Sequence, residues 1–189
     1  MSKVLVIFKN RGIGDICVLV SSLHEVSRKI GEPVTVLAQK NTRAEAIFKD
    51  DPHVSEVIEL DEKGFFNIIK KIKSKKFDQS YIYSDSIRLF LITKLSGIKE
   101  NFHYKFFSKK GKNFFKTAKE FTEKILDTKI DSQSKIYCNK NDIEEAKRKF
   151  SISDKTKNIV CGISASGHTK RWDVNNYIKL FENLNLKFQ

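Results

Sequence analysis

Short apolar runs alternate with amphipathic segments along the first hundred residues. The apolar runs predict strands, and the first of them has no polar side, as expected where both faces of a sheet are covered. The runs are Lys3–Phe8, Val34–Ala38, Val54–Leu60 and Gln79–Tyr83. The segments between them repeat apolar residues every three or four positions, which predicts helices. These are Asp15–Ile30, Thr42–Phe48, Gly64–Lys76 and Ser86–Leu95. The alternation indicates an α/β fold with a doubly wound parallel sheet.

The pattern changes in the middle of the chain. Residues 99–129 hold nine lysines against four acidic residues, with aromatic residues between them, and Asn113–Leu126 predicts a helix. Residues 128–141 read as a connector, and Asp142–Phe150 predicts another helix. The lysines near the end of Gly64–Lys76 are assigned to a solvated helix face.

The strand and helix pattern then restarts near the end. Asn158–Ile163 predicts a strand, Val174–Leu184 a helix, and Leu186–Phe188 the start of a further strand. We therefore expect an α/β domain at residues 1–150 and the beginning of a second at residues 151–189. One strand and one helix cannot bury a core of their own, so we expect this second domain to be incomplete.

Charge and composition narrow the class of protein. Among 189 residues, 36 lysines and arginines face 23 acidic residues, a net charge of +13, and 40% hydrophobic residues suffice for a core. Such a balance favours anionic partners: nucleic acid, acidic lipid headgroups or phosphorylated sugars. Three cysteines without a CxxC pair fit a reducing cytoplasm. With no apolar run of signal-peptide or membrane-span length, we expect a cytoplasmic protein, with peripheral membrane contact left open.

The loop after the first predicted strand contains two glycines and an aspartate. Gly12, Gly14 and Cys17 approximate a dinucleotide-binding GxGxxG with the third glycine replaced. Such a site also needs an acidic residue after the second strand, where this chain has Ala38-Gln39-Lys40. Asp15 would moreover repel a pyrophosphate at the same helix start. The sequence therefore argues against NAD and disfavours NADP.

Asp15 has two interpretations. An aspartate in the first turn of a helix stabilises the exposed amides and the helix dipole, and this segment alone favours that role. The alternative is a general base at the carboxyl edge of the sheet, where α/β folds place their ligands. Gly12 and Gly14 would then let a substrate hydroxyl approach the carboxylate beside Ile13. Such a base needs only to be ionised at neutral pH if proton removal accompanies bond formation.

A second loop, within residues 158–173, has the composition of a phosphate or diphosphate site. Small residues allow close approach of the backbone, hydroxyls bind oxygens, and cations supply charge at a helix start. The candidates are Ser164, Ser166, Gly167, Thr169, Lys170 and Arg171. The alternative is a solvated basic loop with Trp172 docked on the core, and the local pattern does not decide between them.

The two loops together resemble the bacterial heptosyltransferase family, glycosyltransferase family nine. The resemblance rests on GIGD before a helix, Asp51-Pro52-His53-Val54 at a strand start, and S-x-S-G-x-x-K-R-W near the end. Phe77–Tyr104 also resembles the strand, helix, glycine and strand of that family. The resemblance covers nearly the whole chain. It implies a GT-B fold, in which two Rossmann-like domains face a cleft.

The resemblance also implies an activity: inverting, metal-independent transfer of a heptose-like sugar from an ADP-sugar to a lipopolysaccharide core acceptor. Asp15 would deprotonate the acceptor hydroxyl, and Lys170 would neutralise the leaving diphosphate. Gly12, Ile13, Gly14, Ser164, Ser166, Gly167, Thr169 and Arg171 would bind substrate. The implied partners are a nucleotide-sugar donor, an anionic lipid-linked saccharide and the cytoplasmic face of the inner membrane. No cofactor is expected, and the four histidines lack metal-ligand spacing. Since relatives carry a complete second domain, we expect a partial enzyme.

Two other classes remain open. The net charge and the segment rich in lysine and phenylalanine also suit nucleic acid, although the sequence has no helix-turn-helix, RNP-type sheet or zinc motif. The chain could instead be a non-catalytic α/β protein. The basic residues 99–119 are assigned either to the acceptor side or to a merely soluble surface.

Overall fold

A computed structural model describes most of the chain. It covers residues 2–9, 12–60, 64–104, 113–131, 133–155, 157–163, 165 and 168–188, without the side chains of 168 and 185–188. Its contacts divide the chain into two compact units, Met1–Lys140 and Asn141–Gln189. The division falls in the connector before the predicted helix at Asp142–Phe150.

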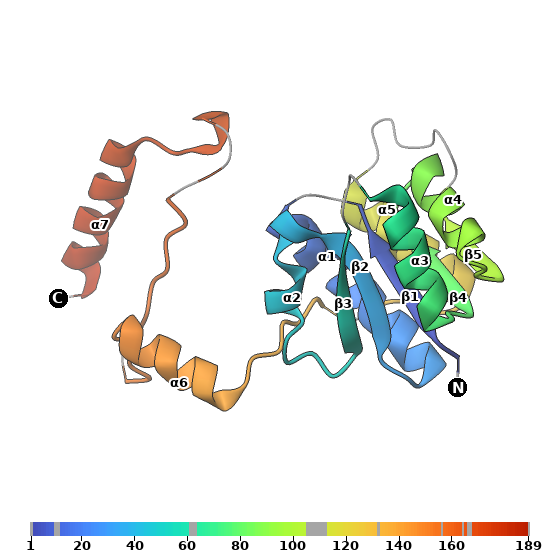
Figure 1. Ribbon diagram of the computed structural model, residues 1–189. Helices are drawn as coiled ribbons and strands as arrows, with labels where there is room; N and C mark the ends of the chain where they lie inside the picture. Colours follow the sequence, from blue (N-terminus) through green and yellow to red (C-terminus); the bar gives the residue numbers. More distant parts are fainter. Residues whose placement is uncertain are drawn as a thin grey trace. The chain divides into compact units, whose positions relative to one another are not determined.

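The first unit is built on a sheet of five parallel strands (Figure 1). The strands are β1 (Val4–Phe8), β2 (Val34–Gln39), β3 (Val54–Leu60), β4 (Gln79–Ile82) and β5 (Glu100–His103), in the order β3-β2-β1-β4-β5. The chain thus winds outward through β2 and β3 and then returns to the other side of β1. This confirms the α/β fold with a doubly wound parallel sheet.

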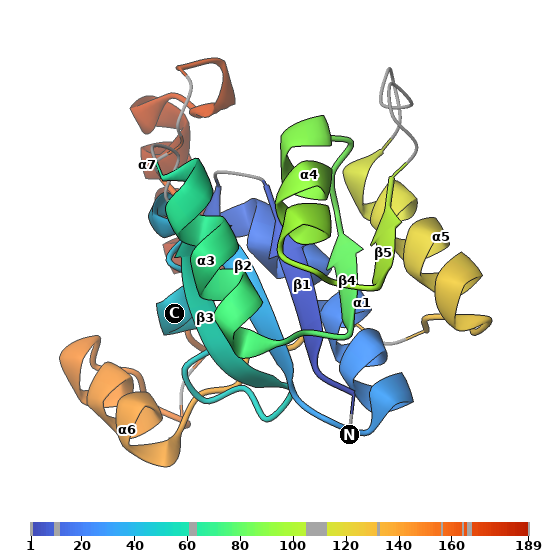
Figure 2. The ribbon, with the colours of Figure 1, turned by 45° about the vertical axis from the view of Figure 1, so that its right-hand side comes forward.

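Helices cover both faces of this sheet. They are α1 (Ile13–Ile30), α2 (Ala44–Ile47), α3 (Phe65–Lys75), α4 (Ile87–Leu95) and α5 (Phe114–Leu126). Helices α3 and α4 lie side by side on one face, and α1 and α5 lie on the other (Figure 2). The predicted helix at Thr42–Phe48 is interrupted: a short 3₁₀ turn ends at Thr42, and Arg43, with a φ of 52°, separates it from α2.

Strand β1 shows why the predicted strand Lys3–Phe8 lacks a polar side. Its five residues are all buried. Val4, Val6 and Phe8 pack into the cluster under α1 and α5, whereas Leu5 and Ile7 pack into the cluster under α3 and α4. Successive side chains of a strand point to opposite faces, so a strand covered on both sides must be apolar throughout.

A buried polar cluster joins α1 to the turn before β3. His24 Nε2 lies 2.8 Å from Asp51 Oδ2, and the His53 amide donates to Asp51 Oδ1 at 2.9 Å. Ser27 Oγ donates to the Glu32 carbonyl and therefore accepts from His53 Nδ1, at 3.1 Å. This turn is the Asp51-Pro52-His53 segment of the sequence resemblance.

The connector passes over the same cluster. The Tyr137 ring lies 5.7 Å from the ring of His24 and 6.3 Å from that of His53, between centroids. Asn139 donates to Asp50 Oδ2 from both its amide and its side chain. These contacts hold the end of the connector on the first unit.

The described residues of the second unit form helices and irregular segments. The unit contains most of α6 (Lys140–Lys149), a 3₁₀ turn at His168–Lys170 and α7 (Val174–Phe188). The strand prediction at Asn158–Ile163 is wrong: these residues form no strand, and Val160 is 90% exposed. A strand needs a neighbouring backbone, and the described part of this unit offers none. The strand prediction at Leu186–Phe188 is also wrong, because α7 continues through these residues and satisfies its amides internally.

Neither unit contains a helix, within the described residues, that combines the length and the apolar character needed to cross a bilayer. All residues of the 18-residue helix α1 are described, and it carries four charged side chains besides His24.

The histidine cluster predicts a dependence of stability on pH. Burial and then the neighbouring His24 lower the pKa of His53, although the Asp51 carboxylate opposes this and Arg28 adds to it. The unfolded chain therefore takes up a proton at a higher pH than the folded chain does. The contribution of His53 to the free energy of unfolding should be complete above a pH of about 6.5, which is the ordinary pKa of histidine. It should be lost as the pH falls through the lower pKa that His53 has in the folded chain.

Urea unfolding on both sides of this pH range measures the effect. His53→Gln keeps a donor for Ser27 and cannot take up the proton, so its unfolding free energy should fall less steeply on acidification. An equally steep fall in His53→Gln would contradict this assignment.

Candidate functional site

The pairing of β1 brings two loops together at the carboxyl edge of the sheet. Ile7 lies opposite Leu37 of β2 and opposite Ile82 of β4. The Tyr83 amide donates to the Ile7 carbonyl at 3.0 Å, which extends the pairing beyond β4. The loops that follow β1 and β4 thus leave the sheet side by side, where the winding direction reverses. Ligands of open α/β sheets bind at such a point.

Asp15 caps the helix that begins at this edge. Gly12 is the residue before α1, and its amide donates to Asp15 Oδ2 at 3.2 Å. A Cβ atom on Gly12 would lie 3.1 Å from that oxygen, so a side chain there would displace the carboxylate. Asp15 Oδ1 has no hydrogen-bond partner among the residues that the structure describes. The capping interpretation is therefore confirmed, and it engages one of the two carboxylate oxygens.

Gly14 has no comparable internal reason to be glycine. A Cβ atom added there would meet no described atom within 4 Å. Its neighbour Ile13 is 48% exposed, although it is a large aliphatic residue at the start of a helix. The backbone before Asp15 is thus accessible from outside, as a substrate hydroxyl would require.

The loop after β4 adds polar residues that sequence reasoning missed. Ser84 is buried and its Oγ accepts from the Ser86 amide at 3.1 Å, which shapes the turn into α4. Asp85 lies between them and is partly exposed. These residues follow a strand just as Gly12–Asp15 do. Only the strand order, with β4 next to β1, shows that the two loops are neighbours.

The second predicted loop is partly described. Thr169, Lys170 and Arg171 are exposed, and the Lys170 ammonium forms no ion pair within the described residues. Arg171 Nε donates to the Ala165 carbonyl at 3.0 Å, which closes the loop on itself. The predicted ligands Ser164, Ser166 and Gly167 lie outside the described residues.

The helix after this loop already has an anionic cap. Asp173 Oδ1 accepts from the Asn175 amide at 2.9 Å at the start of α7. Trp172 is 51% exposed and contacts Tyr177, with ring centroids 4.9 Å apart, rather than a buried core. An anion at this loop would therefore depend on the cations and hydroxyls before Trp172 more than on the amides of α7.

The structure thus groups the predicted site residues into two sets. Gly12, Ile13, Gly14 and Asp15 lie together in the first unit, and Thr169, Lys170 and Arg171 lie together in the second. That the two sets face one another stays a prediction.

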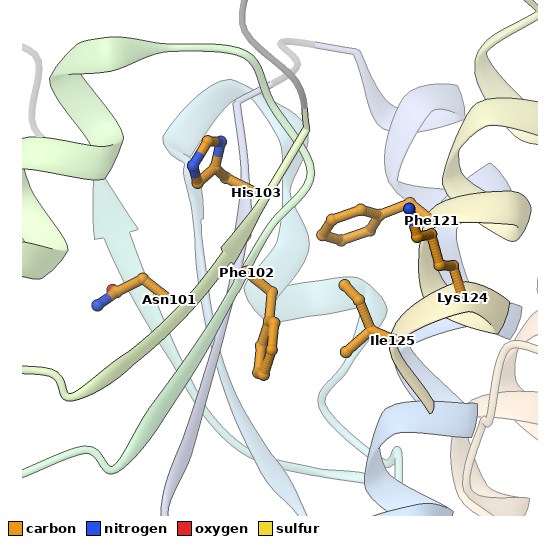
Figure 3. Close-up of a pocket in the computed structure, with 6 residues that line it drawn as sticks. All are labelled: Asn101, Phe102, His103, Phe121, Lys124 and Ile125. Atoms are coloured by element: carbon orange, nitrogen blue, oxygen red, sulfur yellow. The ribbon is translucent and has the colours of Figure 1, made fainter. Parts of the chain in front are cut away.

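An additional groove lies between the edge strand β5 and helix α5, with a volume of about 380 Å³ (Figure 3). Phe121 and Ile125 project from α5 toward the side of β5 that bears Phe102, and Lys124 provides a cation. Asn101 and His103 belong to the same edge. Its apolar walls have the pattern of ordinary core residues, so no sequence signal distinguished them. The groove belongs to the basic aromatic region but does not decide between the acceptor side and a soluble surface.

The first unit therefore defines a class: a doubly wound α/β domain with a glycine-rich, acid-bearing loop at its switch point. No protein-family model matches the sequence, and no curated protein sequence matches it. Solved structures do match the fold.

One match is E. coli ADP-heptose lps heptosyltransferase II, with a TM-score of 0.73 and 16% identity, over 98% of this chain and 62% of that chain. A second is a glycosyl transferase family 9 protein from Veillonella parvula DSM 2008, with a TM-score of 0.69 and 14% identity, over 97% of this chain and 59% of that chain. A third is E. coli heptosyltransferase WaaC with ADP, with a TM-score of 0.62 and 13% identity, over 96% of this chain and 64% of that chain. The expected resemblance to heptosyltransferases is thus confirmed in fold. The chain spans about three fifths of each of those proteins.

Replacing each of the two loop glycines by alanine should change the stability of the first unit in opposite directions. Gly14→Ala adds a better helix former where space is open, so it should raise the free energy of unfolding by up to about 1 kcal/mol. Gly12→Ala should lower it by about 1 kcal/mol, because alanine caps poorly and the added Cβ displaces Asp15. Urea unfolding of both variants measures the difference. Destabilisation by Gly14→Ala would show that internal packing, and not access, requires that glycine.

Proposed function

We propose that the chain is part of an inverting, metal-independent glycosyltransferase that moves a heptose-like sugar from an ADP-sugar to a lipopolysaccharide core acceptor. The observation that carries the proposal is the position of Asp15 at the switch point of a fold shared with heptosyltransferases. The nucleotide is inferred from two of those proteins, one an ADP-heptose transferase and one solved with ADP.

The proposed reaction is a single displacement. The acceptor hydroxyl approaches over Gly14 and loses its proton to Asp15 as its oxygen bonds to the anomeric carbon. The bond from that carbon to the diphosphate breaks on the opposite side, so the anomeric centre inverts. Asp15 Oδ1 is the oxygen proposed to take the proton, because Oδ2 accepts from the Gly12 amide. A positioned base of this kind contributes about 10²–10⁴-fold to the rate.

The leaving diphosphate gains negative charge as that bond breaks. We assign its stabilisation to Lys170, whose ammonium is exposed and lacks a carboxylate partner in the described part of the chain. Thr169 and Arg171 lie beside it, and Ser164, Ser166 and Gly167 complete the proposed set. Cations aimed at developing charge are effective in a site from which water is excluded.

The acceptor and the location follow from the same proposal. A lipid-linked, anionic saccharide suits a chain with a net charge of +13. Such an acceptor lies at the cytoplasmic face of the inner membrane, so the protein would work in the cytoplasm and touch that surface.

Asp15→Asn separates the two roles of this residue. Asparagine retains a side-chain oxygen for the Gly12 amide and caps helices about as well as aspartate, so unfolding should change little. It cannot take up a proton, so transfer in the full-length gene product should fall by about 10²–10⁴-fold. ADP-heptose binding, measured by calorimetry, should stay the same. Equal losses of transfer and donor binding would instead indicate a structural cap alone.

Lys170→Gln tests the other half of the proposal. It should weaken ADP-heptose binding about tenfold or more, because a charge-assisted hydrogen bond to phosphate is lost. Lys179→Gln, which removes an exposed lysine farther along α7, is the matched control and should bind as the parent chain does. Unchanged binding by Lys170→Gln would remove this residue from the donor site.

A further inference from the structure

Helices α3 and α4 form one continuous surface on their face of the sheet. The two helices lie side by side (Figure 2). The Arg88 guanidinium of α4 lies 5.9 Å from the ring centroid of Phe65 in α3. Ser96 Oγ, just after α4, donates to the Ile92 carbonyl of α4 at 2.7 Å and also lies 3.3 Å from the Ile69 carbonyl of α3. Their outer side chains therefore meet a partner as one surface.

The side chains of these two helices carry charge of one sign. Helices α3 and α4 contain no aspartate or glutamate, and their basic residues are Lys70, Lys71, Lys73, Lys75, Arg88 and Lys94. Lys75 pairs with Glu56 of β3. The helices on the other face carry charges of both signs, since α1 and α5 each contain two acidic residues besides their basic ones. An anionic partner is thus favoured on the α3 and α4 side.

The same surface exposes large apolar side chains. Phe66 in the first turn of α3 is 79% exposed. On α4, Ile87, Leu91 and Leu95 are 51%, 44% and 56% exposed. Their spacing of four residues places them along one side of the helix. Leu89 and Ile92 are buried on the inner side, so α4 is apolar on both sides. A helix of this kind is usually covered on its outer side as well.

We propose that the outer surface of α3 and α4 binds an anionic lipid membrane, with Phe66, Ile87, Leu91 and Leu95 entering below the headgroups. Lysine and arginine side chains around them would bind lipid phosphates. Nucleic acid fits less well, because three of these four side chains are aliphatic and offer its bases neither hydrogen bonds nor aromatic stacking, which leaves Phe66 as the one ring of the four. The lysines near the end of α3 then contribute to binding as well as to solvation.

The position of this surface suits the proposed acceptor. Both helices begin at the carboxyl edge of the sheet, where the loop of Gly12–Asp15 also lies. A saccharide anchored in the bound membrane would thus present its hydroxyls near that edge. This consequence rests on the proposed function, whereas lipid binding itself does not.

Sedimentation with vesicles tests the inference without any transfer assay. The 189-residue chain should bind vesicles that contain equal amounts of phosphatidylcholine and phosphatidylglycerol, and bind phosphatidylcholine alone at least tenfold more weakly. The double variant Leu91→Glu with Leu95→Glu should lose at least tenfold in partitioning to the mixed vesicles. Lys70→Gln and Lys73→Gln should each lose about fivefold, and added salt should weaken binding by the parent chain.

Phe115→Glu is the matched control, because Phe115 is 47% exposed on α5, on the other face of the sheet. It should bind as the parent chain does, and circular dichroism should show that every variant is folded. Equal losses in Phe115→Glu, or unchanged binding in the leucine variant, would overturn the proposal. So would tight binding of duplex or single-stranded DNA in place of vesicles, or a dimer that the leucine variant dissociates. If the chain does not bind vesicles but sugar transfer is intact, the membrane proposal is wrong and the proposed function is unaffected.

Discussion

The backbone hydrogen bonds that β1 shares with β2 on one side and β4 on the other determine where the loop of Gly12–Asp15 lies. They make β1 the strand from which the winding reverses, so the loops after β1 and β4 have no crossover helix between them. The apolar residues of β1 hold this position because both faces of the strand are buried. The candidate chemistry therefore depends on the most buried strand of the unit.

The geometry of Asp15 joins a structural role to the proposed chemical one. One carboxylate oxygen accepts the Gly12 amide and so fixes the side chain at the helix start. The other has no described partner, and Gly14 beside it leaves open space. Capping and catalysis are usually weighed as alternatives for such a residue. In this loop the cap orients the carboxylate that the proposed reaction uses.

The sequence predicted the elements whose pattern reflects burial on both faces, such as β1 and β2. It missed β5 in the apolar pattern, because this four-residue edge strand contains no β-branched residue, whereas the other edge strand, β3, contains Val54, Val57 and Ile58. Only the family resemblance implied β5. Asn158–Ile163 has the composition of a strand but forms none, since composition does not supply a neighbouring backbone. Gly12 and Asp15 were found from their local pattern. The place of Ser84 beside this loop became evident only from the strand order, and the groove beside Phe102 only from the packing of α5 against β5.

A crystal structure of the full-length gene product with ADP and a saccharide acceptor tests the central claim most directly. The account predicts that Asp15 Oδ1 lies within hydrogen-bonding reach of an acceptor hydroxyl, or one water away, while Lys170 Nζ contacts the diphosphate across the same cleft. Asp15 and Lys170 on surfaces that open into separate cavities would contradict it. The chain would then share its fold with heptosyltransferases without using these two residues for sugar transfer.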